Sequence, residues 1–176
     1  MSSVTKAQWQ LARRLIAGEI SDGEFCTSIG TTIGGAVSHG VELLRDACAK
    51  KDAHAVEFGL FIGHRFGVTD RHLDVLLQLA DADWHTQHEN VVRGLAQLRS
   101  PESVESLYRL ALARFDYLDY DESFALGVKA IWALGDIATT IAVDRLRDIM
   151  SCDNRVLVEN AARQLDRIAS SDRSKV

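Results

Sequence analysis

The chain has 176 residues, of which 47% are hydrophobic and 26% are charged, the composition of an ordinary globular domain. Its net charge is −5, so it lacks the basic balance with which proteins bind the phosphates of nucleic acid, and we expect no nucleic-acid partner. Cys26, Cys48 and Cys152 are odd in number and widely spaced, which predicts reduced thiols; with no signal-type or membrane-spanning apolar stretch, we expect a cytoplasmic protein.

The first predicted region, residues 1–51, is the least regular part of the chain. Apolar residues that fall largely on one face predict a helix over Lys6–Ala17. The glycine-rich stretch that follows predicts only a short helix at Phe25–Ile29 and a loop, because each glycine lowers helix propensity by about 1 kcal/mol. A further helix is predicted over His39–Ala49. We expect this region to be an atypical helical cap on a repeat array.

The remaining helices are predicted in pairs joined by tight turns. Ser100 before Pro101 is a strong start signal, because a capping hydroxyl precedes proline at the first helical position. A single proline in the whole chain also favours helices over strands and turns. In chain order, the predicted helices are Ala53–Arg65, Thr69–Ala80, His85–Leu98, Pro101–Arg114, Glu122–Asp136, Thr140–Met150 and Arg155–Ile168.

These helices repeat one apolar pattern at a spacing of about 39 residues, the sign of an array whose units bury their apolar faces against their neighbours. The predicted units are 52–83, 84–121, 122–154 and a half repeat at 155–170, followed by a polar tail at 171–176. We expect one compact domain in total. The positions that coincide include Leu95 with Leu134, Leu98 with Ile137, Val104 with Val143, Leu107 with Leu146, and Leu110 with Ile149.

The segments DNRVLVENAARQLDRI and ALGVKAIWALGDIATTIAVDRL resemble the HEAT-like repeats of phycobilin-lyase-type proteins. The resemblance covers about Asp52 to Ile168. It implies an all-α fold: a right-handed α-solenoid of antiparallel helical hairpins, with about nine to ten helices in total. It does not identify an activity, because this architecture hosts scaffolds, lyase subunits, glycosylases and toxin antidotes alike.

The segment Phe115–Glu122 is the most distinctive candidate for contact with a partner. It joins two predicted repeats and combines carboxylates with tyrosines, a pairing suited to a basic protein surface. A structural interpretation is also open, because acidic residues stabilise a helix N-terminus and the aromatic residues can seal the joint between repeats. The candidate partner-binding residues here are Asp116, Tyr117, Asp119, Tyr120, Asp121 and Glu122.

A second candidate is the run from Trp84 to Glu89, in which His85 and His88 stand three residues apart. Histidines at that spacing share a helix face, and with a carboxylate they could bind a metal. No third ligand stands at a recognisable spacing, so we expect no metal and assign Trp84, His85 and His88 to turn packing or partner contact. Cys48 with His54 lacks an orienting acid, and we expect no catalytic residue and no cofactor.

The sequence therefore predicts a non-enzymatic protein-binding α-solenoid that is a monomer when free. By size and charge, we expect an immunity protein that blocks one bacterial toxin, a basic nuclease domain of the contact-dependent growth-inhibition kind. One alternative is a lyase-like, cofactor-handling subunit, for which Cys48, His54, His85 and His88 are the candidate groups. Another alternative is a general scaffold or regulatory adaptor. We also expect Trp132 to be a core residue of a tightly packed helix.

Overall fold

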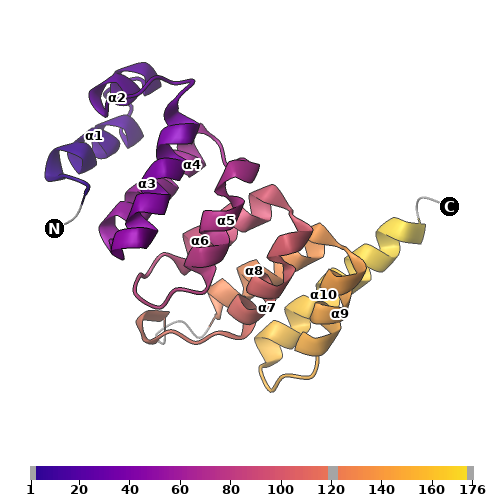
Figure 1. Cartoon of the computed structure of the whole chain (residues 1–176). Coiled ribbons are helices and arrows are strands. Elements are labelled where there is room, and N and C mark those ends of the chain that lie inside the picture. Colours follow the sequence, from indigo (N-terminus) through magenta and orange to yellow (C-terminus); the bar gives the residue numbers. More distant parts are fainter. Residues whose placement is uncertain (1–2, 119–122, 174–176) are drawn as a thin grey trace. The chain divides into compact units, whose positions relative to one another are not determined.

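The computed structural model describes residues 3–118 and 123–173, and it contains ten α-helices and no strand in that part of the chain (Figure 1). This confirms the predicted all-α fold of sequential helix pairs. The chain divides into two compact units, one of residues 1–78 and 82–87, the other of residues 79–81 and 88–176. The predicted boundary at residue 51 falls inside the first unit, and the predicted repeat limits stay a prediction. None of the described helices is long and apolar enough to cross a membrane.

The first unit is an aromatic and aliphatic core enclosed by short helices. Phe25 and Phe58 are completely buried, with ring centroids 6.3 Å apart. Side-chain caps explain where the first helices begin: Thr5 and Ser21 each accept a backbone hydrogen bond at the start of a helix. The helices of this unit are α1 (Lys6–Ile16), α2 (Asp22–Ser28), α3 (Ala36–Lys50), α4 (Ala53–Phe66) and most of α5 (Leu73–Ala80).

Helix α3 begins three residues before the predicted His39, and two glycines within α3 and α4 serve close packing. A Cβ atom on Gly40 would lie 3.0 Å from Ile62 of α4, so the missing side chain lets the two helices approach each other. Gly59 of α4 meets Leu44 of α3 in the same way. Glycine is therefore tolerated inside both helices despite its low helix propensity.

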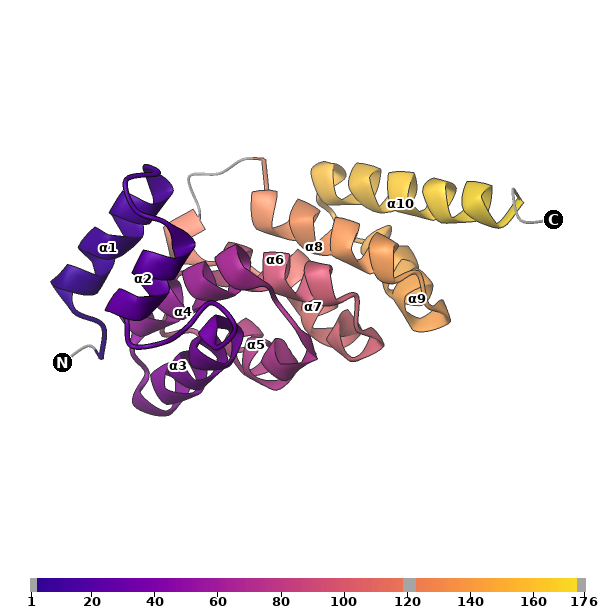
Figure 2. The same ribbon diagram turned by 90° about the horizontal axis from the view of Figure 1, so that it is seen from above.

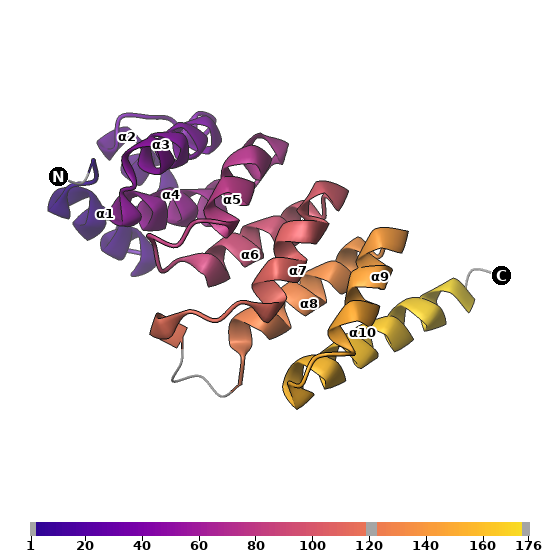
Figure 3. The ribbon, with the colours of Figure 1, turned by 60° about the horizontal axis from the view of Figure 1, so that its bottom comes forward.

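The second unit has the two-layer packing of a helical repeat array. Its helices are α6 (His88–Leu98), α7 (Val104–Leu112), α8 (Ala125–Ile137), α9 (Thr140–Ile149) and α10 (Arg155–Arg173). Helix α8 contacts both α6 and α10, and α7 contacts α9, so alternate helices stack on each other (Figures 2 and 3). Each helix also packs against the next one along the chain.

The predicted repeat positions form the core of this second unit. Leu95 and Leu134 are completely buried in α6 and α8, and Leu107 and Leu146 are completely buried in α7 and α9. A Cβ atom on Gly127 would lie 2.7 Å from the carbonyl oxygen of a residue in α7, which confirms the predicted close approach of helices at α8. The prediction for Trp132 on the same helix is wrong, because its side chain is 45% exposed.

Candidate functional site

The predicted partner-contact segment is anchored to the first residue of α6 by an aromatic cluster. His88 is completely buried, and its Nδ1 lies 2.7 Å from the hydroxyl oxygen of Tyr117. The Phe115 ring stacks on the His88 ring with centroids 3.9 Å apart, and it also packs against Tyr117 at 5.6 Å. The cluster joins the chain after α7 to the start of α6, so it closes one hairpin, whereas the structural interpretation from the sequence placed the aromatic residues between two repeats.

The environment of Tyr117 fixes its protonation state. Burial raises the pKa of Tyr117 to about 12, Glu89 raises it further, and the hydrogen bond with His88 acts in the opposite direction. The hydroxyl is therefore neutral at physiological pH and already engaged with His88. Tyr117 acts within the described structure as an anchor, with a half-buried ring.

Asp116 lies beside this anchor and is exposed to solvent, in a short 3-10 turn over Asp116–Leu118. A fixed turn presents this carboxylate at low conformational cost. The other four residues of the predicted segment, Asp119, Tyr120, Asp121 and Glu122, lie outside the described residues.

The other predicted site residues do not form one constellation. His85 precedes α6, so the prediction that His85 and His88 share a helix face is wrong. The His85 ring is buried, its Nδ1 accepts a hydrogen bond from the Gln87 backbone N–H at 3.0 Å, and the half-buried Trp84 ring packs on it edge to face. In residues 3–118 and 123–173, no three histidine, cysteine or acidic side chains gather as metal ligands.

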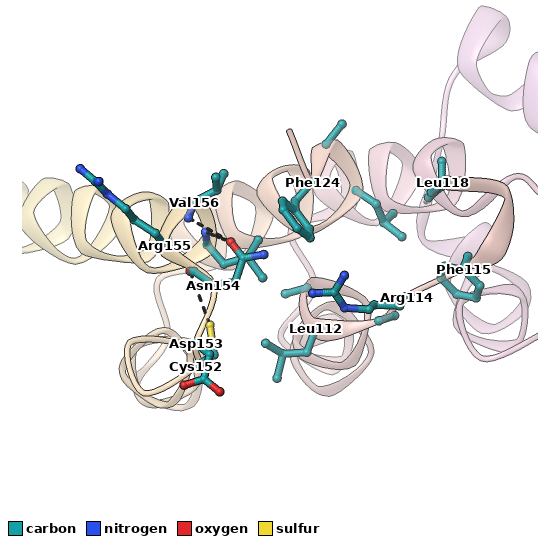
Figure 4. Close-up of a pocket in the computed structure, with 16 residues that line it drawn as sticks. Leu112, Arg114, Phe115, Leu118, Phe124, Cys152, Asp153, Asn154, Arg155 and Val156 are labelled. Carbon is teal, nitrogen blue, oxygen red and sulfur yellow. Dashed lines mark hydrogen bonds between the residues drawn. The ribbon is translucent and has the colours of Figure 1, made fainter. Parts of the chain in front are cut away.

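A cavity of about 680 Å³ opens in the second unit where α7 ends and α8 and α10 begin (Figure 4). Its wall is largely apolar and includes Leu112, Phe115 and Phe124, while the guanidinium of Arg114 lies over the Phe124 ring at 5.2 Å. Asn154 closes one side and caps α10 by accepting hydrogen bonds from two backbone N–H groups of its first turn. None of Cys48, His54, His85 and His88 lines this cavity.

The sequence analysis missed the exposed indole of Trp132 on α8. The Trp132 Nε1–H donates to the side-chain oxygen of Asn160 on α10 at 3.1 Å, so the edge of the ring is held in place. The Arg167 guanidinium of the same helix lies 6.0 Å from the ring centroid. Helix α8 has hydrophobic residues on nearly every side, so the spacing of its hydrophobic residues does not show which side faces solvent. Lys129 and Asp136, three residues before and four after the tryptophan, are the signal that its face is exposed.

The comparisons with known proteins agree with this architecture. Residues 128–152, from α8 through the turn to the end of α9, match the sequence profile of the PBS lyase HEAT-like repeat. No curated protein and no solved structure matches the chain. The α8–α9 hairpin is therefore a HEAT-like repeat in both sequence and structure, and the match assigns no activity.

Proposed function

We propose that this chain is a non-enzymatic protein-binding module of HEAT-like repeats, and that it is an immunity protein. Its partner is one bacterial toxin, a basic nuclease domain, whose active site it blocks, and the free protein is a monomer. The observation that carries the proposal is the anchoring of the segment from Phe115 by His88, which presents the exposed Asp116 at the start of an acidic, tyrosine-containing sequence.

The physical basis is complementarity of charge beside a turn that is fixed before binding. Residues 115–118, which the contact with His88 anchors, lose little conformational freedom when a partner docks, so more of their contact energy appears as affinity. The chain carries a net charge of −5, and carboxylates beside tyrosines match an arginine- and lysine-rich surface. Such complementarity also accelerates encounter with a basic partner, an advantage for an inhibitor that must act before its toxin does.

The test separates the charges of the segment from its anchor. Asp116, Asp119 and Asp121 are changed together to asparagine while Tyr117 is retained, and the affinity for the product of the neighbouring gene is measured by calorimetric titration. We expect the affinity to fall at least about tenfold, because charge pairs across an interface contribute strongly to binding.

The matched control changes Asp144 and Asp148 of α9 to asparagine, which removes exposed carboxylates from the other helix layer. This control should leave the affinity unchanged. Equal affinity for the wild-type protein and the segment variant would remove this segment from the interface.

The cavity at the ends of α7, α8 and α10 supports a second candidate, a cofactor-handling subunit. Its volume of about 680 Å³ lies in the range of small-molecule sites, and its largely apolar wall, which also holds Arg114, Arg155 and Asp153, suits a flat, acid-bearing molecule. Titration with biliverdin, followed by absorbance, tests this candidate. A shifted spectrum that is lost in Phe124→Ala supports it, and an unchanged spectrum rejects a bilin ligand.

A further inference from the structure

The outer side of the α6, α8 and α10 layer is a continuous surface centred on Trp132. Lys129 of α8 forms an ion pair with Glu89 of α6 at 3.1 Å, which places both side chains on this side. Arg167 of α10 pairs with Asp136 of α8 at 2.7 Å on the same side. We call this surface the Trp132 face; its residues are Glu89, Arg93, Lys129, Trp132, Asp136, Asn160, Arg163 and Arg167.

Helical spacing adds two arginines to those contacts. Arg93 follows Glu89 by one turn of α6, and Arg163 follows Asn160 by one turn of α10, so each shares its neighbour's face. Both arginines are exposed, and neither forms an ion pair within the described residues. The outer sides of α7 and α9 differ in this respect, because Arg109, Arg145 and Arg147 are all paired with carboxylates there.

The Trp132 face is less acidic than the protein as a whole. It carries four cationic side chains and two carboxylates, both paired, with Glu159 and Asp166 at its border one turn from Arg163, whereas the whole chain carries −5. Its indole is 45% exposed with its N–H already bonded to Asn160, so the ring itself is the surface left for contact. A fixed, half-exposed tryptophan between arginines has the composition of a binding hot spot.

We propose that the Trp132 face binds an acidic segment of a partner protein. An apolar side chain of that segment covers the Trp132 ring, and its carboxylates pair with Arg93 and Arg163 on either side. This inference goes beyond the proposed function, because the acidic segment that begins at Asp116 meets a basic surface, whereas this face takes an acidic one. The two contacts depend on different residues and are tested by different variants.

A protein segment fits this face better than a nucleic acid does. Glu89 and Asp136 stand on the face itself, and each would repel the phosphates of a strand stacked on the indole. An acidic peptide can place its few carboxylates opposite the arginines and leave the rest of its surface neutral.

The experiment uses the full-length protein and a designed helical peptide of about four turns, with leucines along one stripe and glutamates on both flanks of that stripe. A second peptide carries lysine in place of every glutamate. Binding is followed by the NMR signal of the Trp132 indole N–H, assigned by its loss in Trp132→Phe. We expect the acidic peptide to shift this signal and the lysine peptide to leave it unchanged. The affinity for the acidic peptide should fall as salt is added.

The variants identify the groups responsible. Replacing both Arg93 and Arg163 by glutamate should weaken the acidic peptide at least about tenfold. The control Arg147→Glu, which changes a paired arginine of α9, should leave the peptide affinity unchanged. Circular dichroism of each variant verifies that the helices remain.

Four results would overturn the proposal. They are an indole signal that does not move at millimolar peptide, equal binding of the lysine peptide, equal weakening by the control, and tighter binding of a single-stranded DNA oligomer than of the acidic peptide. Because Asp116 is intact in every variant, none of these results bears on the acidic segment.

Discussion

The Nδ1 atom of His88 lies 2.7 Å from the hydroxyl oxygen of Tyr117, and this contact connects the start of α6 to the chain that follows α7. His88 has no exposed surface, and Phe115 covers its ring at a centroid distance of 3.9 Å. The contact therefore closes the α6–α7 hairpin at the place where the acidic segment begins. The stability of this contact determines how much conformational freedom the Asp116 side chain and its turn retain.

Removing the Tyr117 hydroxyl should weaken that contact. Tyr117→Phe keeps the ring but removes the hydroxyl that lies 2.7 Å from Nδ1 of the buried His88, and the loss of such a buried hydrogen bond costs about 1–3 kcal/mol. We expect a decrease of that size in the free energy of unfolding, measured by urea denaturation. Tyr108→Phe, which alters a tyrosine of α7 outside this cluster, is the control and should cost less. Equal stability of Tyr117→Phe and the wild type would mean that the hydrogen bond does not hold the hairpin closed.

The raised pKa of Tyr117 predicts an unusual alkaline titration. Burial raises it from 10 to about 12, so the folded state holds this proton more tightly than the unfolded state does. The resulting stabilisation is complete below pH 10 and is lost as the pH rises through 12. In an absorbance titration of phenolate, a late step near pH 12 should appear, and this late step should vanish in Tyr117→Phe. A late step that persists in the variant would assign it to another tyrosine.

The buried His72 should make the free energy of unfolding of the first unit depend on pH under mildly acidic conditions. Its ring is 1% exposed, its Nδ1 lies 3.1 Å from the Thr69 backbone nitrogen, and its Nε2 has no hydrogen-bond partner among the described residues. Burial lowers the pKa of His72 below its ordinary 6.5, Arg71 and Arg45 lower it further, and the contact with Thr69 raises it. Because the folded state binds this proton more weakly, stability is complete above pH 6.5 and falls as the pH decreases below that value.

The measurement compares urea denaturation at neutral and mildly acidic pH. His72→Gln keeps a capping side chain but cannot titrate, so the loss of stability on acidification should be smaller than in the wild type. His54→Gln, at an exposed position, should leave the loss unchanged. A pH dependence that is the same in all three proteins would exclude His72 as its source.

Replacing Gly127 by alanine should lower the stability of the second unit strongly, although it adds only a methyl group. An added Cβ atom would lie 2.7 Å from both the Ala111 carbonyl oxygen and the Leu157 side chain, so α8 would have to move away from its neighbours. Gly127→Ala should therefore lower the free energy of unfolding by about 1–3 kcal/mol, although alanine is the better helix former. Gly23→Ala is the matched control, because the nearest atom to its added Cβ lies 3.8 Å away. Its unfolding free energy should stay constant or rise, and a loss as large as that of Gly127→Ala would contradict the packing argument.

Periodicity predicted the second unit well because each repeat supplies the same buried positions. Leu95 and Leu134 show this directly, since both are completely buried at equivalent places. A local signal also marked one helix start, because Ser100 caps the 3-10 turn at Pro101–Ser103 that leads into α7. These features depend on residues close in sequence or on a strict repeat, and both are visible without coordinates.

The site was less predictable because its parts are far apart in the sequence. The pairing of His88 with Tyr117 spans 29 residues and leaves no spacing signature. Trp132 was wrongly assigned to the core because α8 is apolar on most sides, so its hydrophobic residues alone did not separate the core side from the outer side. Lys129 and Asp136 mark the outer side in the sequence, and the ion pairs of both residues with neighbouring helices agree with it.

An immunity protein blocks its toxic partner by binding it, and we propose that function for this chain. Co-expression with the product of the neighbouring gene tests it, scored by cell survival and by co-purification of the two proteins. We expect the neighbour alone to arrest growth, and this chain to restore growth and purify with it as a complex. A neighbour that is harmless alone and does not bind this chain would exclude the proposed function.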